Sequence, residues 1–381
     1  MNSTKNTYTV CKNCVMDTSD PNIQFNKDHV CDHCVTFKKH TLPVWKKKQN
    51  SPEMENKLLA SIRTEGKGKD FDCLIGMSGG IDSSYLTYLA KEKLGLRPLV
   101  FHVDAGWNSQ IAVNNIERLV DGLDLNLFTE VINWREMRDL QLAFFKSGVP
   151  HIDTPQDHAF FATMYKFAAK HNIKYILTGG NLSTECIRNP IEWMYYQSDA
   201  TQLLDIHRKF GTLPLDTFPI TSVFWHKVWL PFFRGIKVLR PLDMHKYIKE
   251  EAKSLLIERF GWQPYPQKHF ESRFTKFYES YWLPKRFGYD VRRVQFSSLI
   301  LTEQMSRHEA IELLKQPSYD KQSIGYEIEF IANKLDITIE QLKSFMELPH
   351  KTYRNYKNQR QIYDFGASVL RSMGLLIGSK R

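Results

Sequence analysis

The sequence has 381 residues, with 52 basic and 42 acidic side chains and a formal net charge of +10. Apolar residues make up 42% and charged residues 25%, which excludes a disordered or fibrous chain and is typical of a soluble globular protein. The length predicts about two domains. The positive charge favours an anionic partner, such as nucleic acid, an anionic lipid surface or a phosphorylated small molecule.

The longest apolar stretch, residues 223–239, does not predict a membrane span. A span needs about 20 mostly apolar residues, and this stretch is interrupted by His226, Lys227, Arg234 and Lys237. The first ten residues lack the charged and then apolar pattern of a secretory signal. We therefore expect a cytoplasmic protein with no membrane partner.

Four of the six cysteines form two Cys-x-x-Cys pairs separated by sixteen residues, namely Cys11, Cys14, Cys31 and Cys34. In a cytoplasmic chain this spacing predicts a metal site and not a disulfide framework. Two such turns complete a tetrahedron of thiolates around one ion. We expect structural zinc, with an iron–sulfur cluster or free thiols as alternatives. A site closed by four sulfurs has no open position for catalysis.

Short apolar runs alternate with helix-like segments in the middle of the chain. Strands are expected at 72–77, 98–103, 125–132 and 174–177, and helices at 82–94, 111–123, 134–145 and 158–171. This alternation predicts the α/β class with a doubly wound parallel sheet. Ligands of such a sheet bind at the carboxyl ends of its strands.

After residue 242 the pattern becomes largely helical, with helices expected at 246–260, 307–315, 321–335 and 339–348. Thr338 and Gln341 form a plausible capping box for the last of these helices. We divide the chain into a zinc-binding module (1–45), a linker (46–69), the sheet domain (70–242) and a helical C-terminal region for substrate or partner (243–381).

A glycine-rich loop follows the first expected strand and opens the next helix. It consists of Ser78, Gly79, Gly80, Ile81, Asp82, Ser83 and Ser84. Its glycines let backbone amides converge on an anion at a helix N-terminus, and its serines add hydroxyl donors. Asp82 would suit a Mg²⁺ ion that accompanies phosphates. The loop is neither a Walker A nor a dinucleotide-binding motif. A capped turn without a ligand is the alternative.

The pattern Ser-Gly-Gly-x-Asp-Ser resembles the signature of the PP-loop ATP pyrophosphatases. Two further matches, at 102–106 and 178–185, follow later strands. The resemblance implies that the loop binds the β,γ-pyrophosphate of ATP and that a substrate oxygen is adenylated and then displaced by a nitrogen or sulfur nucleophile. It also implies contacts from the later segments: adenine or ribose contacts from His102, Val103 and Asp104, and α-phosphate, metal or ammonia contacts from Gly179, Gly180, Asn181 and Glu185.

Over essentially the whole chain, the sequence resembles the N-acetyl sugar amidotransferases, which are WbpG- and PseA-like enzymes of bacterial surface-glycan synthesis. The matching motifs are CKNCVMDTSDP (11–21), MSGGIDSSYL (77–86), HVDAGWNS (102–109), DTPQDHA (153–159), GGNLSTE (179–185) and HFESRFTKF (269–277). This resemblance implies that an acetamido group on a UDP-linked or other nucleotide-linked sugar becomes an acetamidino group, with release of AMP and pyrophosphate, in the synthesis of LPS O-antigen or a related glycan.

The nitrogen source is expected to be a separate glutaminase subunit. A glutaminase needs a cysteine nucleophile at a mature N-terminus or on a sharp elbow, and neither is evident. Asn2 follows Met1, and the segments around Cys73 and Cys186 are not elbows. The family resemblance also implies such a partner.

Further site residues are expected from charge and position. Lys227 and Arg240, with Arg273 and Lys276, are candidates to stabilise the departing pyrophosphate. Asp153, Asp157, Arg273 and Lys276 are expected to contact substrate, and His158 is a candidate general base. The basic and aromatic segment 264–293 would bind a uridine diphosphate by stacking and charge pairing, and it could bind RNA through the same interactions. A solvated amphipathic helix is the alternative for that segment.

Two other functional classes are considered. A PP-loop enzyme that modifies tRNA would explain the positive charge, but no RNA-binding module apart from the four-cysteine segment is recognisable, so nucleic acid is not the expected partner. Thiolation would require extra sulfur-carrying cysteines, and only Cys73 and Cys186 remain. An inactive scaffold is disfavoured because the loop, Asn181 and Glu185 are all present.

Overall fold

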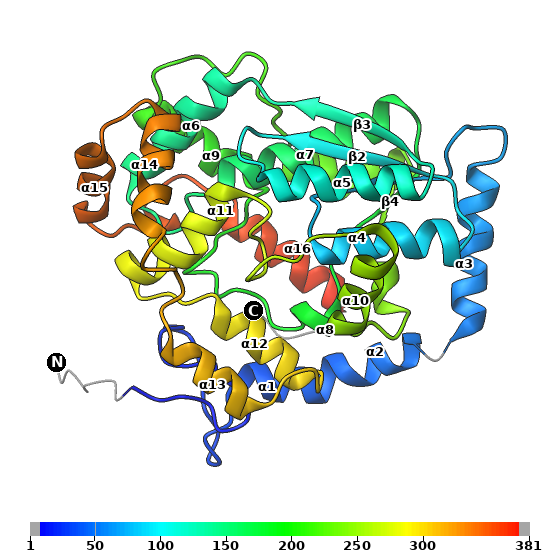
Figure 1. The fold of residues 1–381 in the computed structure, drawn as a ribbon, viewed down its shortest axis with the longest axis horizontal. Coiled ribbons are helices and arrows are strands. Elements are labelled where there is room, and N and C mark those ends of the chain that lie inside the picture. Colours follow the sequence, from blue (N-terminus) through cyan, green and yellow to red (C-terminus); the bar gives the residue numbers. More distant parts are fainter. Residues whose placement is uncertain (1–7, 50, 373–381) are drawn as a thin grey trace.

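A parallel five-stranded sheet forms the centre of the computed structural model, which describes residues 8–49 and 51–372 (Figure 1). The strands lie in the order β3-β2-β1-β4-β5. Their bounds are β1 Cys73–Gly76, β2 Pro98–Asp104, β3 Asn126–Val131, β4 Tyr175–Leu177 and β5 Lys237–Leu239. All neighbouring strands pair in parallel, with Leu74 opposite Leu99 on one side and Ile176 on the other. The expected α/β fold with a doubly wound sheet is confirmed.

The central strands β1, β2 and β4 are buried on both faces, and their side chains alternate between two hydrophobic clusters. On β1, Leu74 belongs to one hydrophobic cluster, whereas Cys73 and Ile75 belong to the other. On β2, Phe101 belongs to the same cluster as Leu74, and Val100 belongs to the cluster of Cys73 and Ile75. Helices α4, α5 and α10 pack together on one face, and α6, α7 and α9 on the other (Figure 1).

Helical segments fill the connections between strands. Up to β5 and just after it they are α1 Asp32–Thr36, η1 Phe37–Thr41, α2 Leu42–Gln49, α3 Pro52–Glu65, α4 Ile81–Tyr88, η2 Leu89–Lys93, α5 Gln110–Gly122, α6 Trp134–Ser147, α7 Thr154–Lys170, α8 Leu182–Glu185, α9 Ala200–Phe210, η3 Trp225–Phe233 and η4 Pro241–Asp243. The C-terminal region contains α10 Lys249–Phe260, α11 Arg273–Phe277, η5 Tyr278–Phe287, α12 Arg292–Leu301, α13 Arg307–Lys315, α14 Ile324–Leu335, α15 Ile339–Glu347, η6 Tyr353–Asn355 and α16 Arg360–Ser372.

The expected strands and helices are present, and several elements were not anticipated. Strand β5 was missed because it is a short edge strand with two exposed residues. Helix α9 was also missed, and the segment treated as a linker forms helices α2 and α3. The capping box of Thr338 and Gln341 at the start of α15 is confirmed, with both reciprocal hydrogen bonds present.

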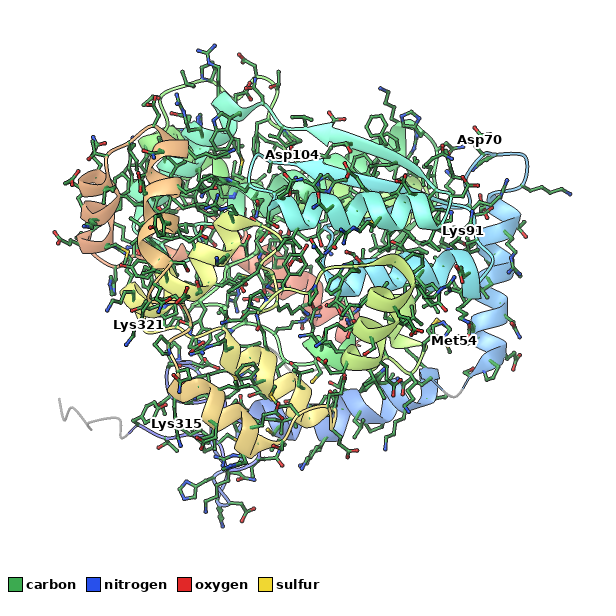
Figure 2. All side chains as sticks on the ribbon, in the orientation of Figure 1. Met54, Asp70, Lys91, Asp104, Lys315 and Lys321 are labelled. Carbon is green, nitrogen blue, oxygen red and sulfur yellow. The ribbon has the colours of Figure 1, made fainter. Side chains whose placement is uncertain are left out.

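The four-cysteine segment packs against the C-terminal region, beside α12 and α13 (Figure 1). The Val15 amide donates to Ser297 Oγ at 3.1 Å, and Arg307 Nε donates to the Cys14 carbonyl at 3.0 Å. Charged side chains such as Asp70, Lys315 and Lys321 project from the outer surface (Figure 2). None of the helices in the described residues is long and apolar enough to cross a membrane.

Candidate functional site

A cleft of about 430 Å³ opens beside the sheet where its strand order reverses, between β1 and β4. Open α/β sheets bind ligands at such a point, outside the carboxyl ends of the strands. The cleft is lined by the loops that follow β1, β2 and β4, by helices α7 and α10, and by the segment 262–272. The three motifs singled out in the sequence therefore converge on one cavity.

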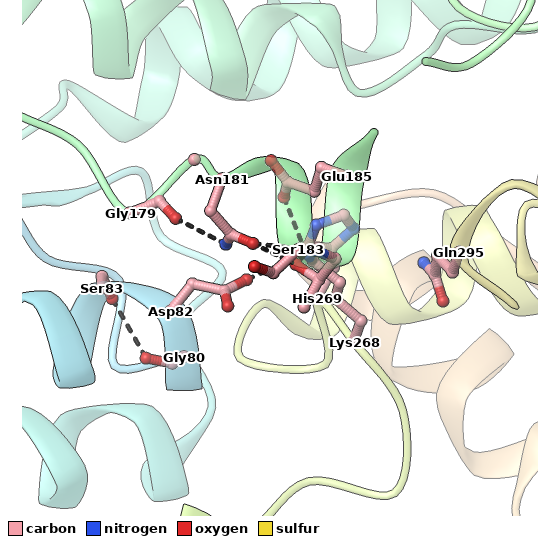
Figure 3. A network of polar contacts seen from close by, with 12 residues as sticks. Gly80, Asp82, Ser83, Gly179, Asn181, Ser183, Glu185, Lys268, His269 and Gln295 are labelled. Atoms are coloured by element: carbon pink, nitrogen blue, oxygen red, sulfur yellow. Dashed lines mark hydrogen bonds and ion pairs between the residues drawn. The ribbon is translucent and has the colours of Figure 1, made fainter. Parts of the chain in front are cut away.

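The glycine-rich loop after β1 has the geometry of an anion site. Gly79 has φ +83°, and a Cβ there would lie 2.6 Å from the Ala112 carbonyl, so no other residue fits. Gly80 is the N-cap of α4 and has no side chain to cap the helix, which leaves its positive end available to a ligand. The Ser83 hydroxyl donates to the Gly80 carbonyl at 3.1 Å (Figure 3).

Asp82 lies at the centre of a half-buried polar network (Figure 3). The Tyr247 hydroxyl donates to Asp82 Oδ1 at 2.6 Å, and Lys268 Nζ donates to Asp82 Oδ2 at 2.9 Å. The same ammonium donates to Glu185 Oε1 at 2.7 Å and to Thr184 Oγ1 at 3.1 Å. Lys268 thus joins the loop after β1 to the loop after β4.

The charges of this network shift the pKa values of Asp82 and Lys268. Burial raises the pKa of Asp82, but the Lys268 ammonium and the hydrogen bonds from Tyr247 and Lys268 outweigh it, so the pKa lies below its usual value. Burial lowers the pKa of Lys268, and the Asp82 and Glu185 carboxylates more than reverse that effect. Asp82 and Lys268 are therefore both charged at neutral pH.

The oxygen atoms of Asp82 and Glu185 fit a magnesium ion. Mg²⁺ takes oxygen ligands and is bound in proteins through one or two carboxylates together with substrate phosphates. Here two carboxylates converge on a single cation beside the anion-binding loop. Asp82 and Glu185 are thus the residues that would hold the ion.

The loop after β4 is held close to the glycine-rich loop. A Cβ on Gly179 would lie 2.8 Å from the Ser83 amide nitrogen, so a glycine is needed for this approach. Asn181 caps α8, because its Oδ1 accepts from the Thr184 amide at 2.8 Å. Arg240 Nε donates to the Gly180 carbonyl at 3.0 Å. Asn181 and Arg240 thus shape this loop, and neither is among the residues that line the cleft.

The segment 262–272 covers the glycine-rich loop. Trp262 Nε1 and the Tyr265 hydroxyl each donate to the Gly79 carbonyl at 3.2 Å. The Ser78 hydroxyl donates to Glu271 Oε1 at 3.3 Å. None of these contacts was predicted, and Lys268, Tyr247 and Glu271 were not chosen as site residues. The sequence signals for this segment were the motif at 269–277 and the basic and aromatic composition of residues 264–293.

Of the remaining residues expected to bind ATP, His102 and Val103 line the cleft, whereas Asp104 and Ser84 do not. Asn108 Nδ2 donates to His102 Nε2 at 2.9 Å, which leaves Nδ1–H to donate to the Met77 carbonyl at 2.8 Å. Asp104 accepts from the Gly106 amide and so closes its own turn. Ser84 is fully buried inside α4.

Several predicted catalytic or substrate residues do not reach the cleft. His158 is buried, and both of its ring nitrogens are occupied. Nε2 accepts from the Thr221 amide at 3.1 Å, and Nδ1 contacts the Gln197 carbonyl at 2.8 Å. Neither nitrogen is left to act as a base. Lys227 lies on η3, outside the residues that line the cleft.

Arg273 and Lys276 are not among the residues that line the cleft. Both pair with Glu327 of α14, at 3.1 Å and 2.9 Å, and the Arg273 guanidinium lies over the Phe330 ring. The aromatic residues around them are core residues: Phe274, Phe277, Tyr278 and Trp282 are each at most 1% exposed. Within the basic and aromatic segment 264–293, the residues that line the cleft all lie between 264 and 272.

Asp153 is buried and Asp157 half-buried, at the start of α7. The Thr275 hydroxyl donates to Asp153 Oδ2 at 2.7 Å, and Gln197 Nε2 donates to Asp157 Oδ2 at 3.0 Å. They do not line the ATP cleft, but His269, which does, lies near both of them.

The four cysteines of the N-terminal segment form a metal-binding site. Their sulfur atoms all lie within 4.8 Å of one another, with separations of 3.6 to 3.9 Å between Cys11 and Cys34, Cys14 and Cys31, and Cys31 and Cys34. Thiolates about 2.3 Å from a tetrahedral zinc ion are spaced in this way. Cys73 is buried in β1, and Cys186 Sγ contacts the Ser298 carbonyl at 3.7 Å.

Known proteins resemble this chain over different parts of its length. The family model described as "LPS biosynthesis protein WbpG-like, C-terminal domain" matches residues 271–370. An uncharacterized protein of Methanocaldococcus jannaschii is 22% identical over 323 residues, which cover 82% of this chain and 95% of that protein. The glutamine-hydrolyzing GMP synthase of Chlamydia muridarum is 27% identical over 188 residues, which cover 49% of this chain and 32% of the synthase.

Among solved structures, the U34-tRNA thiolase NcsA of Methanococcus maripaludis has a TM-score of 0.30 and 14% identity, and the match covers 70% of this chain and 81% of the thiolase. The chain spans about a third of the GMP synthase but nearly the whole of the M. jannaschii protein. The match to a GMP synthase supports the PP-loop ATP pyrophosphatase superfamily, and residues 271–370 are similar to the C-terminal domain of WbpG-like LPS biosynthesis proteins.

Proposed function

We propose that this protein is an ATP-dependent amidotransferase that converts an acetamido group of a nucleotide-linked sugar into an acetamidino group, in the cytoplasm, for LPS O-antigen or related surface-glycan synthesis. The observation that carries the proposal is the Asp82–Lys268–Glu185 network, which lies beside an anion-binding loop at the switch point of the sheet. The WbpG-like C-terminal domain supports the assignment to glycan synthesis.

The chemistry requires that a poor leaving group be activated. An amide oxygen does not leave readily, so its adenylation by ATP would create an AMP leaving group and release pyrophosphate. Ammonia would then add to the carbon, and AMP would depart to give the amidine. Each step is a displacement without a change of oxidation state, and ATP and ammonia are consumed.

The cleft residues fit the adenylation step. The glycine-rich loop and the N-terminus of α4 would hold the pyrophosphate, and Asp82 and Glu185 would hold Mg²⁺, which neutralises phosphate charge when bound. Lys268, which lies only 2.9 Å from Asp82 Oδ2, would stabilise the negative charge that develops on the phosphates. His102 and Val103 would flank the nucleoside.

Ammonia would come from a separate glutaminase subunit. Within the described residues, Cys73 and Cys186 are enclosed in β1 and against α12, and the other four cysteines belong to the metal site. None of them has the exposure that a glutaminase nucleophile needs. Structural zinc is the metal proposed for the four-cysteine site.

The test is mass spectrometry of reactions that contain ATP, Mg²⁺, ammonium and a panel of UDP-linked N-acetyl sugars. A product about one mass unit lighter than its substrate, formed together with AMP and pyrophosphate and lost in Asp82→Asn, supports the proposal. If no sugar reacts and added tRNA instead stimulates AMP release, the alternative holds, and the protein modifies tRNA. The net charge of +10 is what favours that alternative.

A further inference from the structure

The helix η3 presents an aromatic face to solvent. Its inner face is buried, since His226 and Leu230 are 6% and 2% exposed. On its outer face, Trp229, Phe232 and Phe233 are 42%, 77% and 64% exposed. The Trp229 and Phe233 rings stack with their centroids 4.7 Å apart, so they lie on the same side of the helix. The solvent side of a surface helix normally carries polar side chains, so this face is expected to contact a partner.

Positive charges flank this aromatic face. Residues 217–242 contain no aspartate or glutamate. Lys227 lies on η3, Arg234 is its C-cap residue and Lys237 begins β5, and all three are exposed. None of these three pairs with a carboxylate of the described residues. Lys174 adds a further ammonium, which donates to the Arg234 carbonyl at 2.8 Å. The surroundings of the aromatic face therefore suit an anionic partner.

The combination of charge and ring geometry favours an anionic lipid surface over a nucleic acid. Bases stack on aromatic rings that are free to receive them, but the Trp229 and Phe233 rings already stack on each other at an interplanar angle of 19°. Tryptophan and phenylalanine on one side, with lysine and arginine beside them, are typical of helices that lie in the interface of a membrane. Anionic headgroups attract each such lysine or arginine near the surface.

A row of stacked rings connects η3 to the cleft. Phe161 of α7 lines the cleft, and its ring stacks on that of Tyr165 with the centroids 6.5 Å apart. Tyr165 in turn stacks on the imidazole of His226, on the inner face of η3, with the centroids 5.8 Å apart. A membrane bound at the outer face of η3 would therefore lie only a few side chains away from the cleft.

We propose that η3 binds the anionic surface of a membrane. Its three outer aromatic side chains insert at the boundary between headgroups and acyl chains, and Lys227, Arg234 and Lys237 pair with lipid phosphates. A helix bound in this way lies in the plane of the membrane and does not cross it. The expectation of no membrane partner rested on the lack of a membrane span, which this mode of binding does not need. The proposal is independent of the reaction in the cleft.

The first test measures co-sedimentation of the full chain with vesicles. Vesicles of phosphatidylcholine alone are compared with vesicles that also contain phosphatidylglycerol. The wild type should bind the anionic vesicles, and added NaCl should weaken this binding. Phe232→Ala combined with Phe233→Ala should lower the affinity at least about tenfold, because two inserted rings are lost. Tyr326→Ala on α14 is the matched control, since its side chain is 75% exposed but lies outside η3.

A charge variant completes this test. Lys237→Gln should lower the affinity for anionic vesicles about fivefold, as expected for one lysine at the headgroups. No binding by the wild type, equal binding to the two kinds of vesicle, or equal binding by the double phenylalanine variant and Tyr326→Ala overturns the proposal. A wild-type dimer that the double variant dissociates, without vesicle binding, would show instead that this face joins two copies of the chain.

The second test locates the inserted surface. Trp229 is the most exposed tryptophan of the described residues. Lipids with brominated acyl chains should therefore quench part of the tryptophan fluorescence of the bound wild type. Trp229→Phe keeps an aromatic ring and should still bind the vesicles, but this quenching should be lost. Quenching that persists in Trp229→Phe would place another surface in the membrane and overturns the assignment to η3.

Discussion

Lys268 Nζ lies 2.9 Å from Asp82 Oδ2, although 186 residues separate the two positions in the sequence. The ammonium occupies the space between Asp82 and Glu185, where a magnesium ion would bind (Figure 3). If Asp82 and Glu185 held Mg²⁺ beside ATP, as proposed, Lys268 would be free to pair with the phosphates. Lys268 thus pairs with both acids in the free protein and lowers the pKa of Asp82.

Replacement of this lysine should disable adenylation. In Lys268→Met, sugar-dependent ATP–pyrophosphate exchange should fall on the order of 10²–10³-fold, the usual loss when a group that stabilises developing charge is removed. The control is Lys315→Met on α13, whose ammonium pairs with Glu312 at the surface. Equal exchange rates in the two variants would exclude Lys268 from the reaction.

Two neighbouring glycines, Gly179 and Gly180, allow a matched pair of alanine substitutions in the loop after β4. A Cβ on Gly179 would lie 2.8 Å from the Ser83 amide nitrogen, whereas one on Gly180 would have its nearest neighbour at 3.6 Å. Gly179→Ala should therefore push this loop away from the glycine-rich loop and weaken ATP binding at least about tenfold. Gly180→Ala should bind ATP as the wild type does. Isothermal titration with a non-hydrolysable ATP analogue measures both, and similar affinities would contradict the geometry.

The sequence predicted the parts of the site that depend on local pattern. Buried strands and the loops that follow them are short-range features, so the β1 and β4 loops were placed correctly relative to the sheet. The family resemblance of the segment after the second expected strand also predicted His102 and Val103 as site residues, and both line the cleft.

Contacts between residues that lie far apart in the sequence could not be predicted from local patterns. Charge and aromatic content suggested Arg273 and Lys276 as substrate ligands, but Glu327, which pairs with both, comes from a helix fifty residues later. Position alone suggested His158, whose two ring nitrogens bond to backbone groups from two other loops. Lys268 has no motif of its own, and only folding places it beside Asp82.

The four-cysteine site should influence the cleft at a distance. Ser297 Oγ accepts from the Val15 amide, and Ser298 Oγ accepts from the Ile187 amide, just after the helix that bears Glu185. Metal removal should loosen this connection and lower exchange activity on the order of 10–100-fold, as small displacements of catalytic groups do. A chelator, followed by zinc re-addition, tests this with metal analysis at each stage. Full activity of the metal-free protein would contradict the coupling.

The ion pair of His269 and Glu279 should make stability depend on pH. Burial lowers the pKa of His269, but the charge and hydrogen bond of Glu279 outweigh burial and raise it to about 9, from an ordinary value of 6.5. Because the folded pKa is higher, the stabilisation is complete below pH 6.5 and is lost as the pH rises through 9. The melting temperature of wild type minus that of His269→Gln should shrink between pH 6.5 and pH 9.5 or so. A difference that stays constant over this interval would show that the imidazole is not held charged.

Cys186 allows transfer of nitrogen to be distinguished from transfer of sulfur. It follows Glu185 directly, yet its sulfur contacts the Ser298 carbonyl and burial raises the pKa of its thiol, which disfavours the reactive thiolate. Cys186→Ala should therefore leave ATP–pyrophosphate exchange and amidine formation within about twofold of wild type, because only a small buried group is lost. An enzyme that passed a persulfide through this residue would lose turnover completely while exchange persisted. Measuring both steps on the same variant separates transfer of nitrogen from transfer of sulfur.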